Sequence, residues 1–141
     1  MSIDIGESEI VAVLGSSGSG KSLLAHTILG ILPYNAHVTG ELKFKGQILN
    51  QEIKEKLRGR EICIIPQSVN FLDPLMKVSD QAIGECKDKN ECKEKKLRQR
   101  EVFSKYGLDE SVDDLYPFEL SGGMARKVLL STALLNDPDL L

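Results

Sequence analysis

Residues 15–22 read Gly-Ser-Ser-Gly-Ser-Gly-Lys-Ser, and the fold can be deduced outward from this short stretch. Before it lies the apolar run Ile10-Val-Ala-Val-Leu14, which predicts a buried strand. After it, residues 22–32 combine helix formers with amphipathic spacing, and Pro33 marks the end of that helix. The spacing fits the pattern G-x-x-x-x-G-K-S/T, and a strand before it and a helix after it are the context that this pattern requires.

This loop predicts a binding site for the phosphates of a nucleoside triphosphate. Its glycines let the backbone wrap closely enough to aim several N–H groups at phosphate oxygens. The positive end of the following helix dipole adds attraction, Lys21 reaches the β- and γ-phosphates, and the Ser22 hydroxyl ligates Mg²⁺. The loop alone does not separate transporter motors from kinases, GTPases or helicases. The residues expected to bind the phosphates are Gly15, Ser16, Ser17, Gly18, Ser19, Gly20, Lys21 and Ser22.

The remaining segments alternate between strand-like and helix-like patterns. Strands are expected at residues 2–5, 38–44 and 61–65, with a short helix at 51–57 between the last two. The strongly charged residues 79–106 are expected to be helical with a solvated face, and residues 124–135 form another helix. Asp139-Leu-Leu141 looks like the beginning of a further strand. This order predicts an α/β domain.

Composition excludes several function classes. With 141 residues, 41% hydrophobic and 28% charged, the chain suits one packed globular domain. Its formal net charge of −3 gives no reason to expect binding to nucleic acid or to an anionic membrane surface. No apolar run approaches the roughly 20 residues that span a bilayer, so we expect a cytoplasmic protein without direct membrane insertion. The cysteines Cys63, Cys86 and Cys92 fit no CxxC or zinc spacing, and all three are interpreted as reduced thiols.

Two further motifs narrow the family. Leu120-Ser-Gly-Gly-Met124 opens a predicted helix and resembles the LSGGQ signature of ATP-binding cassette (ABC) ATPases. Such a helix N-terminus offers backbone N–H groups and a serine hydroxyl to an anion. A serine-capped helix after a glycine turn would explain the same residues, but their position after a phosphate loop favours the signature. Ile62-Cys-Ile-Ile-Pro-Gln67 resembles the Q-loop of the same family.

The wider sequence resembles one branch of that family. Leu29-Gly-Ile-Leu-Pro33 and Tyr116-Pro-Phe-Glu-Leu-Ser-Gly-Gly-Met124 are similar to the ATPases of dipeptide, oligopeptide and nickel importers, in which methionine replaces the signature glutamine. The resemblance implies an α/β fold: a P-loop NTPase core, with a partial parallel sheet and antiparallel N-terminal strands, plus the ABC helical subdomain, truncated at both ends. Residues 1–141 would then be a partial nucleotide-binding domain. Its expected portions are the core at 1–70, the helical subdomain at 71–124 and the start of the return to the core at 125–141.

The resemblance also implies cofactors and site residues. The cofactors are ATP and Mg²⁺, and two motor subunits meet head to tail as a homo- or heterodimer. ATP held by Lys21 and Ser22 of one subunit is completed by the signature of its neighbour. Gln67, together with Ser22, is expected to ligate Mg²⁺ and to position the attacking water. The signature residues expected to contact the neighbour's ATP are Ser121, Gly122 and Gly123.

Membrane-embedded permease subunits are the other implied partners. The motor would attach to them at the inner face of the cell membrane and couple ATP binding and hydrolysis to uptake of a peptide or of nickel or a metal chelate. Within residues 70–78, the segment that faces this partner in the family, Phe71, Leu72 and Leu75 would equally suit a local core.

Two functions remain open at this point. The first is a working fragment of an importer ATPase. The second is a truncated nucleotide-binding module without hydrolysis, because neither the Asp-Glu pair that ends the Walker B strand nor the switch histidine is found among the 141 residues. A kinase or GTPase would need its own recognition sequences, such as an NKxD motif, which the chain lacks.

Overall fold

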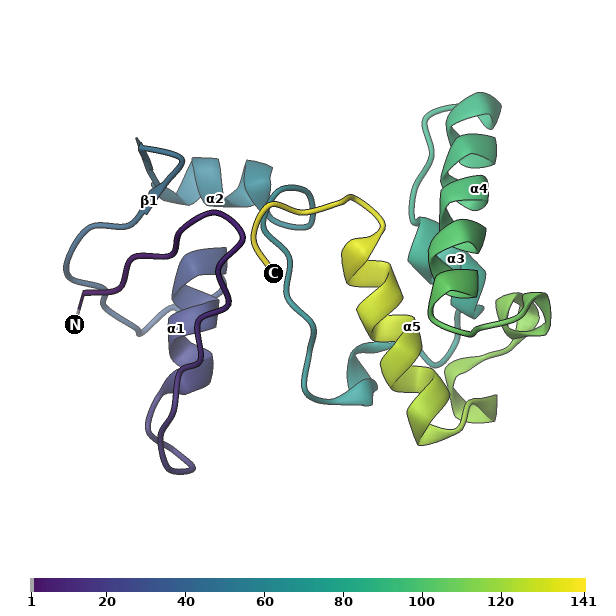
Figure 1. The fold of residues 1–141 in the computed structure, drawn as a ribbon, viewed down its shortest axis with the longest axis horizontal. Helices are drawn as coiled ribbons and strands as arrows, with labels where there is room; N and C mark the ends of the chain where they lie inside the picture. Colours follow the sequence, from purple (N-terminus) through teal and green to yellow (C-terminus); the bar gives the residue numbers. More distant parts are fainter. Residues whose placement is uncertain (1) are drawn as a thin grey trace. The chain divides into compact units, whose positions relative to one another are not determined.

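The computed structural model describes residues 2–141, which divide into two compact units (Figure 1). The first unit ends at Glu55, and the second comprises Lys56–Leu141. The three family portions expected from the sequence, 1–70, 71–124 and 125–141, remain a prediction.

The first unit is built around helix α1 (Lys21–Leu29). Its last residue, Leu29, comes three residues before the helix end expected from the sequence, at residue 32. The helix stops there because Gly30 has a φ of 69°, in the left-handed region that glycine adopts easily. Helix α2 (Gln51–Leu57), with the bounds predicted, begins in this unit. Its Lys54 ammonium donates to the Thr27 carbonyl at 2.8 Å, and the Gln51 amide donates to the Gly30 carbonyl at 3.0 Å. These side chains donate to carbonyls at the C-terminal end of α1, where the Thr27 carbonyl also accepts from the Gly30 N–H at 3.3 Å.

A short hairpin precedes α2. Strands β1 (Lys43–Phe44) and β2 (Gln47–Ile48) pair antiparallel, with Phe44 opposite Gln47. Lys45 and Gly46 form the turn with φ values of 49° and 79°, the positive pair that a two-residue hairpin turn requires. Only the end of the strand predicted at 38–44 therefore forms a ladder.

The strands predicted at residues 2–5 and 10–14 are wrong in the part of the chain that the structure describes. Neither segment is assigned as a strand, and the side chains of Ile10 and Leu14 are 98% and 91% exposed. A strand exists only through hydrogen bonds to a neighbour, and no described segment pairs with either one. Residues 10–14 thus have the apolar composition of a buried strand, but they are neither paired nor buried.

The second unit is mainly helical. It contains α3 (Val78–Ile83), α4 (Lys89–Lys105) and α5 (Gly122–Leu134), with 3₁₀ turns η1 (Val69–Phe71), η2 (Glu110–Asp114) and η3 (Pro117–Glu119). One apolar core joins these elements, and its members are buried on α3, α4, η2 and α5 or on the loops between them. They are Leu72, Val78, Phe103, Leu108, Val112, Ala125, Val128 and Leu129. The sequence left open whether Phe71, Leu72 and Leu75 form a local core or face a partner. Leu72 belongs to the core, whereas Phe71 and Leu75 are 72% and 88% exposed.

The charged stretch predicted as one helix at 79–106 is interrupted. Gly84, with φ 66° and ψ −160°, ends α3, and Asp88 starts α4 four residues later. Cys86 and Cys92 are joined by a disulfide across this turn, so the interpretation of all three cysteines as reduced thiols is wrong for these two. The turn brings their Cα atoms to 5.3 Å, within the range that a disulfide spans, although their sequence spacing matches no known motif. Cys63 is free and half-buried, and burial raises the pKa of its thiol.

The two ends of the second unit meet. Ile62 forms an isolated parallel bridge with Leu140, supported by the bonds from the Cys63 N–H to the Leu140 carbonyl at 2.9 Å and from the Leu140 N–H to the Glu61 carbonyl at 3.0 Å. The segments predicted as strands at 61–65 and from 139 onward therefore lie side by side, although each contributes a single bridge residue. Among the described residues, none of the helices has the length and apolar character needed to cross a bilayer.

Candidate nucleotide-binding site

The predicted phosphate loop has a backbone that only glycine adopts without strain. Gly18 and Gly20 have φ values of 81° and 90°, and Gly20 is the N-cap of α1. A side chain added at either position would meet no atom within 4 Å, so the requirement for glycine there is conformational. At Gly15 the requirement is spatial, because a Cβ atom would lie 2.6 Å from the Ser19 hydroxyl oxygen.

The loop closes around the ammonium group of Lys21. This group donates to the carbonyls of Gly15 and Ser16 at 2.8 and 2.7 Å and to the Ser19 hydroxyl at 3.4 Å. The Ser19 N–H also donates to the Ser16 carbonyl at 3.2 Å. A lysine at the first helical position thus faces back over its own loop. An anion placed in the loop would meet a positive charge that is already held at its centre.

The start of α1 is open to a ligand. No side chain caps its N-terminus, so the N–H groups of the first turn keep their hydrogen-bonding capacity. No acidic residue lies in that turn to compete with an anion for the positive end of the helix dipole. The exposed hydroxyl of Ser22 lies on the same turn. Three uncapped amides, an ammonium and a hydroxyl form a donor set that suits a phosphate chain with its Mg²⁺.

The second candidate segment, Ser121–Gly123, begins α5. Ser121 is its N-cap, and its hydroxyl accepts from the Met124 N–H at 3.2 Å. Gly122 and Gly123 form the exposed first turn, where an added Cβ atom would meet nothing within 4 Å. The packing of the chain itself therefore does not demand these glycines. Their bare backbone leaves two amides approachable from outside.

A charged cluster holds the segment that precedes α5, and sequence reasoning missed it. In η2, Asp113 accepts from the amide of Gln99 at 2.8 Å and pairs with the Arg100 guanidinium, and both partners lie on α4. Gln99 is fully buried, and Arg100 also donates to the Leu108 carbonyl at 2.8 Å. The charged run 79–106 had been interpreted as a solvated face. Nothing in its composition distinguishes the inward Gln99 and Arg100 from their exposed neighbours.

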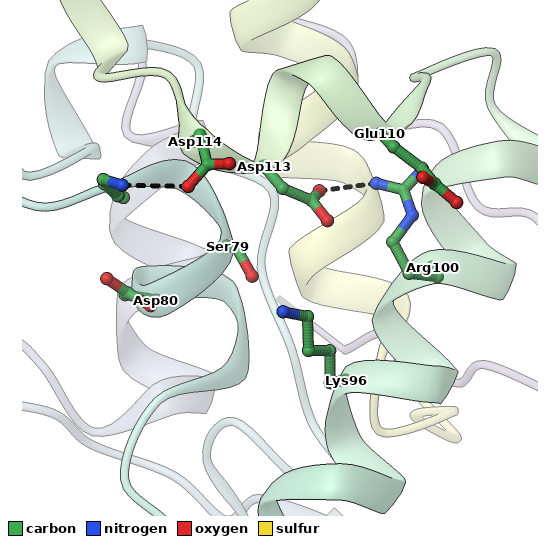
Figure 2. Close-up of a pocket in the computed structure, with 8 residues that line it drawn as sticks. Ser79, Asp80, Lys96, Arg100, Glu110, Asp113 and Asp114 are labelled. Carbon is green, nitrogen blue, oxygen red and sulfur yellow. Dashed lines mark hydrogen bonds and ion pairs between the residues drawn. The ribbon is translucent and has the colours of Figure 1, made fainter.

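This cluster borders a shallow cleft between α3, α4 and η2 (Figure 2). The cleft has a volume of about 350 Å³, and Ser79 of α3 faces Lys96 of α4 across it. At its rim, the Lys77 ammonium pairs with Asp114 at 2.8 Å, which raises the pKa of Lys77 and lowers that of Asp114 through the hydrogen bond and the charges. The lining residues are Lys77, Ser79, Asp80, Lys96, Arg100, Glu110, Asp113 and Asp114.

The third candidate, Gln67, is exposed on the bend that follows residues 61–65. Residues 15–22 are thus gathered into one loop in the first unit, and residues 121–123 share one helix turn in the second unit. Gln67 lies in the second unit and is not grouped with either of these sets of residues. Its role as a ligand of Mg²⁺ stays a prediction.

Comparisons with known proteins identify the family of the chain. Residues 1–141 match the family model described as ABC transporter. Over 152 aligned positions, the chain is 37% identical to the peptidoglycan transport ATP-binding protein YejF of Agrobacterium fabrum and 34% identical to the dipeptide transport ATP-binding protein DppD of Bacillus subtilis. These alignments cover 100% of this chain but only 28% and 45% of those proteins, so the chain spans less than half the length of these relatives.

Solved structures give the same answer for the fold. The dimeric structure of MJ0796, a bacterial ABC transporter cassette, superposes with a TM-score of 0.77 at 26% identity, covering 96% of this chain and 60% of that one. A post-hydrolysis state of the same cassette, bound to ADP and Pi, gives a TM-score of 0.74. The predicted α/β fold class, a P-loop NTPase core with a helical subdomain, is thereby confirmed.

Proposed function

Since the chain belongs to the ABC transporter family, we propose that it binds MgATP as part of the motor subunit of an importer and that ATP hydrolysis by the complete motor drives uptake of a peptide. The observation that carries the proposal is the loop at residues 15–22, with its glycine backbone, its central Lys21 ammonium and the uncapped start of α1. The names of the relatives favour a peptide over nickel or a metal chelate as cargo.

In this proposal the chain's own residues bind and orient the phosphates. The Lys21 ammonium leaves the Gly15 and Ser16 carbonyls and meets the β- and γ-phosphate oxygens, while the first amides of α1 donate to the remaining oxygens. The Ser22 hydroxyl and the Gln67 amide oxygen would hold Mg²⁺, which neutralises charge on the phosphates when bound. Gln67 would also orient the water for in-line attack.

Ser121, Gly122 and Gly123 would complete the ATP site of a second motor subunit. The exposed first turn of α5 offers two amides and a dipole end to a γ-phosphate that approaches from outside. Ala125, Val128 and Leu129 anchor α5 in the apolar core, and such packing supports the position of its first turn. We place the subunit on the inner face of the membrane, attached to permease subunits, in a homo- or heterodimer.

Titration of the purified chain with MgATP in a calorimeter tests the binding step. Replacing Lys21 with alanine removes a charged donor worth about 1.5–3 kcal/mol, so affinity is expected to fall about ten- to a hundredfold. Lys93→Ala, an equal change of charge at an exposed position of α4, serves as the matched control and should leave affinity unchanged. Equal losses in the two variants would show that binding is nonspecific and would sink the proposal. Phosphate release measured on the same samples separates binding from turnover.

A further inference from the structure

Cys86 and Cys92 form a disulfide across an accessible turn of the second unit. Cys86 is half-buried in the turn between α3 and α4, and Cys92 is exposed on the first turns of α4. Neither belongs to the candidate nucleotide site or to the apolar core. The third cysteine, Cys63, is free, so its reactivity can be compared with that of the pair in the same chain.

Noncovalent contacts hold this turn in the same shape. The Asp88 carboxylate accepts from the two amides at the start of α4 at 2.8 and 2.9 Å, and the Glu91 carboxylate accepts from the Lys87 N–H at 2.7 Å. The Lys95 ammonium donates to the Glu85 carbonyl at 2.6 Å and pairs with Glu91 at 3.2 Å. None of these bonds involves a sulfur atom. We infer that they also hold the turn when both cysteines are thiols, which makes ring closure an intramolecular step.

Charged side chains of both signs surround the pair. Lys87 follows Cys86 directly, Lys93 follows Cys92, and the Lys95 ammonium is bonded to the residue before Cys86. Acidic residues balance this charge, since Glu85 precedes Cys86 and Glu91 precedes Cys92. The thiolate is the form that attacks a disulfide, and Cys92 is exposed to such a partner. Burial raises the pKa of the Cys63 thiol. The pair and the single cysteine are thus expected to differ in reactivity.

We propose that Cys86 and Cys92 form a reversible thiol–disulfide exchange site whose reaction partner is a small disulfide of the glutathione class. The exposed Cys92 thiolate attacks one sulfur of glutathione disulfide, forms a mixed disulfide and releases one glutathione thiolate. The Cys86 thiolate then attacks the Cys92 sulfur, closes the protein disulfide and releases the second glutathione. The two protein thiols are oxidised, glutathione disulfide is reduced, and the two thiol protons end on the released glutathione molecules.

The inference rests on the proposed function, because a motor subunit at the inner face of the membrane meets a reducing glutathione pool. In such a compartment an accessible disulfide is usually transient and responds to redox state. Oxidation ties the Gly84 end of α3 to the first turns of α4, and reduction leaves the turn to its hydrogen bonds. The site thus converts the glutathione balance into a change in the stiffness of one turn.

The test is equilibration of the full chain in glutathione buffers that range from reducing to oxidising, followed by acid quench, alkylation and intact mass measurement. The wild type should carry three labels in the most reducing buffer and one in the most oxidising, with the two labels lost together. Cys63→Ser should change from two labels to none, because the exchanging pair is intact. Cys86→Ser should instead accumulate a glutathione adduct, because Cys92 has lost its resolving partner.

Three results would overturn the proposal. Retention of all three labels in the most oxidising buffer would mean that the thiols do not exchange. Persistence of the disulfide in the most reducing buffer would make it a permanent structural bond. Loss of the label from Cys63, with the labels on Cys86 and Cys92 retained, would mean that Cys63 is the reactive cysteine and the pair is not. Because quenched chains are analysed by mass and nucleotide is absent, these outcomes are independent of whether the chain binds MgATP.

Discussion

Asp113 and Asp114 are adjacent residues of equal charge in different surroundings, and alanine substitution of each tests the structure of the helical unit. The Asp113 side chain is 13% exposed and its partner Arg100 is 19% exposed. Among the described residues, Asp113→Ala leaves the Arg100 guanidinium with the Leu108 carbonyl as its one hydrogen-bond acceptor, and it removes the acceptor of the Gln99 amide. The Gln99 Oε1 atom already has no hydrogen-bond partner among the described residues, so the whole buried amide would then be unsatisfied.

The expected cost follows from these environments. An unsatisfied buried polar group costs about 1–3 kcal/mol, and breaking a fully buried ion pair costs about 3–5 kcal/mol. Because water can partly reach Arg100, we expect Asp113→Ala to lower the free energy of unfolding by about 2–3 kcal/mol. Asp114, whose side chain is 84% exposed, pairs with Lys77 at the surface and should contribute almost nothing when it is replaced.

The assay is urea unfolding at neutral pH, monitored by circular dichroism, with the slope of the transition compared between variants. Adding Arg100→Met to Asp113→Ala should recover part of the loss, because the stranded charge is then removed. Equal losses for the two aspartate variants would refute the reasoning. A larger loss for Asp114→Ala would mean that the buried cluster is not where stability resides.

Three further predictions follow from single contacts. Phe103→Ala, at a fully buried core position, should lower the free energy of unfolding by about 3–5 kcal/mol in the same urea assay, whereas Phe71→Ala, at a 72% exposed position, should have little effect. Ser121→Ala removes the acceptor of the Met124 N–H and should cost about 1 kcal/mol, with Ser121→Thr retaining most of the cap; equal losses for the two would exclude the cap as the cause. Bonds from the Lys87 N–H and then from Lys95 lower the pKa of Glu91 below its ordinary value of 4.5, so its stabilisation of the turn is complete above that value and is lost as pH falls through the lowered pKa. The measurement is hydrogen exchange of the turn amides at successive pH values from 6 downward, with each rate divided by the intrinsic exchange rate at that pH. Protection of these amides should fall in the wild type and should not change in Glu91→Gln.

The conformation of the loop at residues 15–22 follows from local signals. The spacing of its glycines predicts a tight turn, and Gly18 and Gly20 do have positive φ values, because such a loop is set by a few consecutive residues. Its role in binding phosphate stays a prediction. The bounds of α2 and the serine cap of α5 are also local, since each depends on residues within one turn of a helix.

Nonlocal features were missed. The apolar run 10–14 predicted a buried strand, but a strand depends on a partner that composition does not specify. The disulfide depends on the break at Gly84, which returns the chain onto the start of α4, and the charged pattern around it contains no sign of that return. The inward direction of Gln99 was hidden for the same reason, because a helix that is polar on nearly every face has no apolar stripe to mark its buried side.

The bridge between Ile62 and Leu140 brings together the two ends of the mainly helical segment that lies between these residues. A segment whose entry and exit points are hydrogen-bonded neighbours can be replaced by a short linker with little loss of closure entropy. The segment between residues 62 and 140 is therefore a module that can be removed or exchanged at one pair of neighbouring residues.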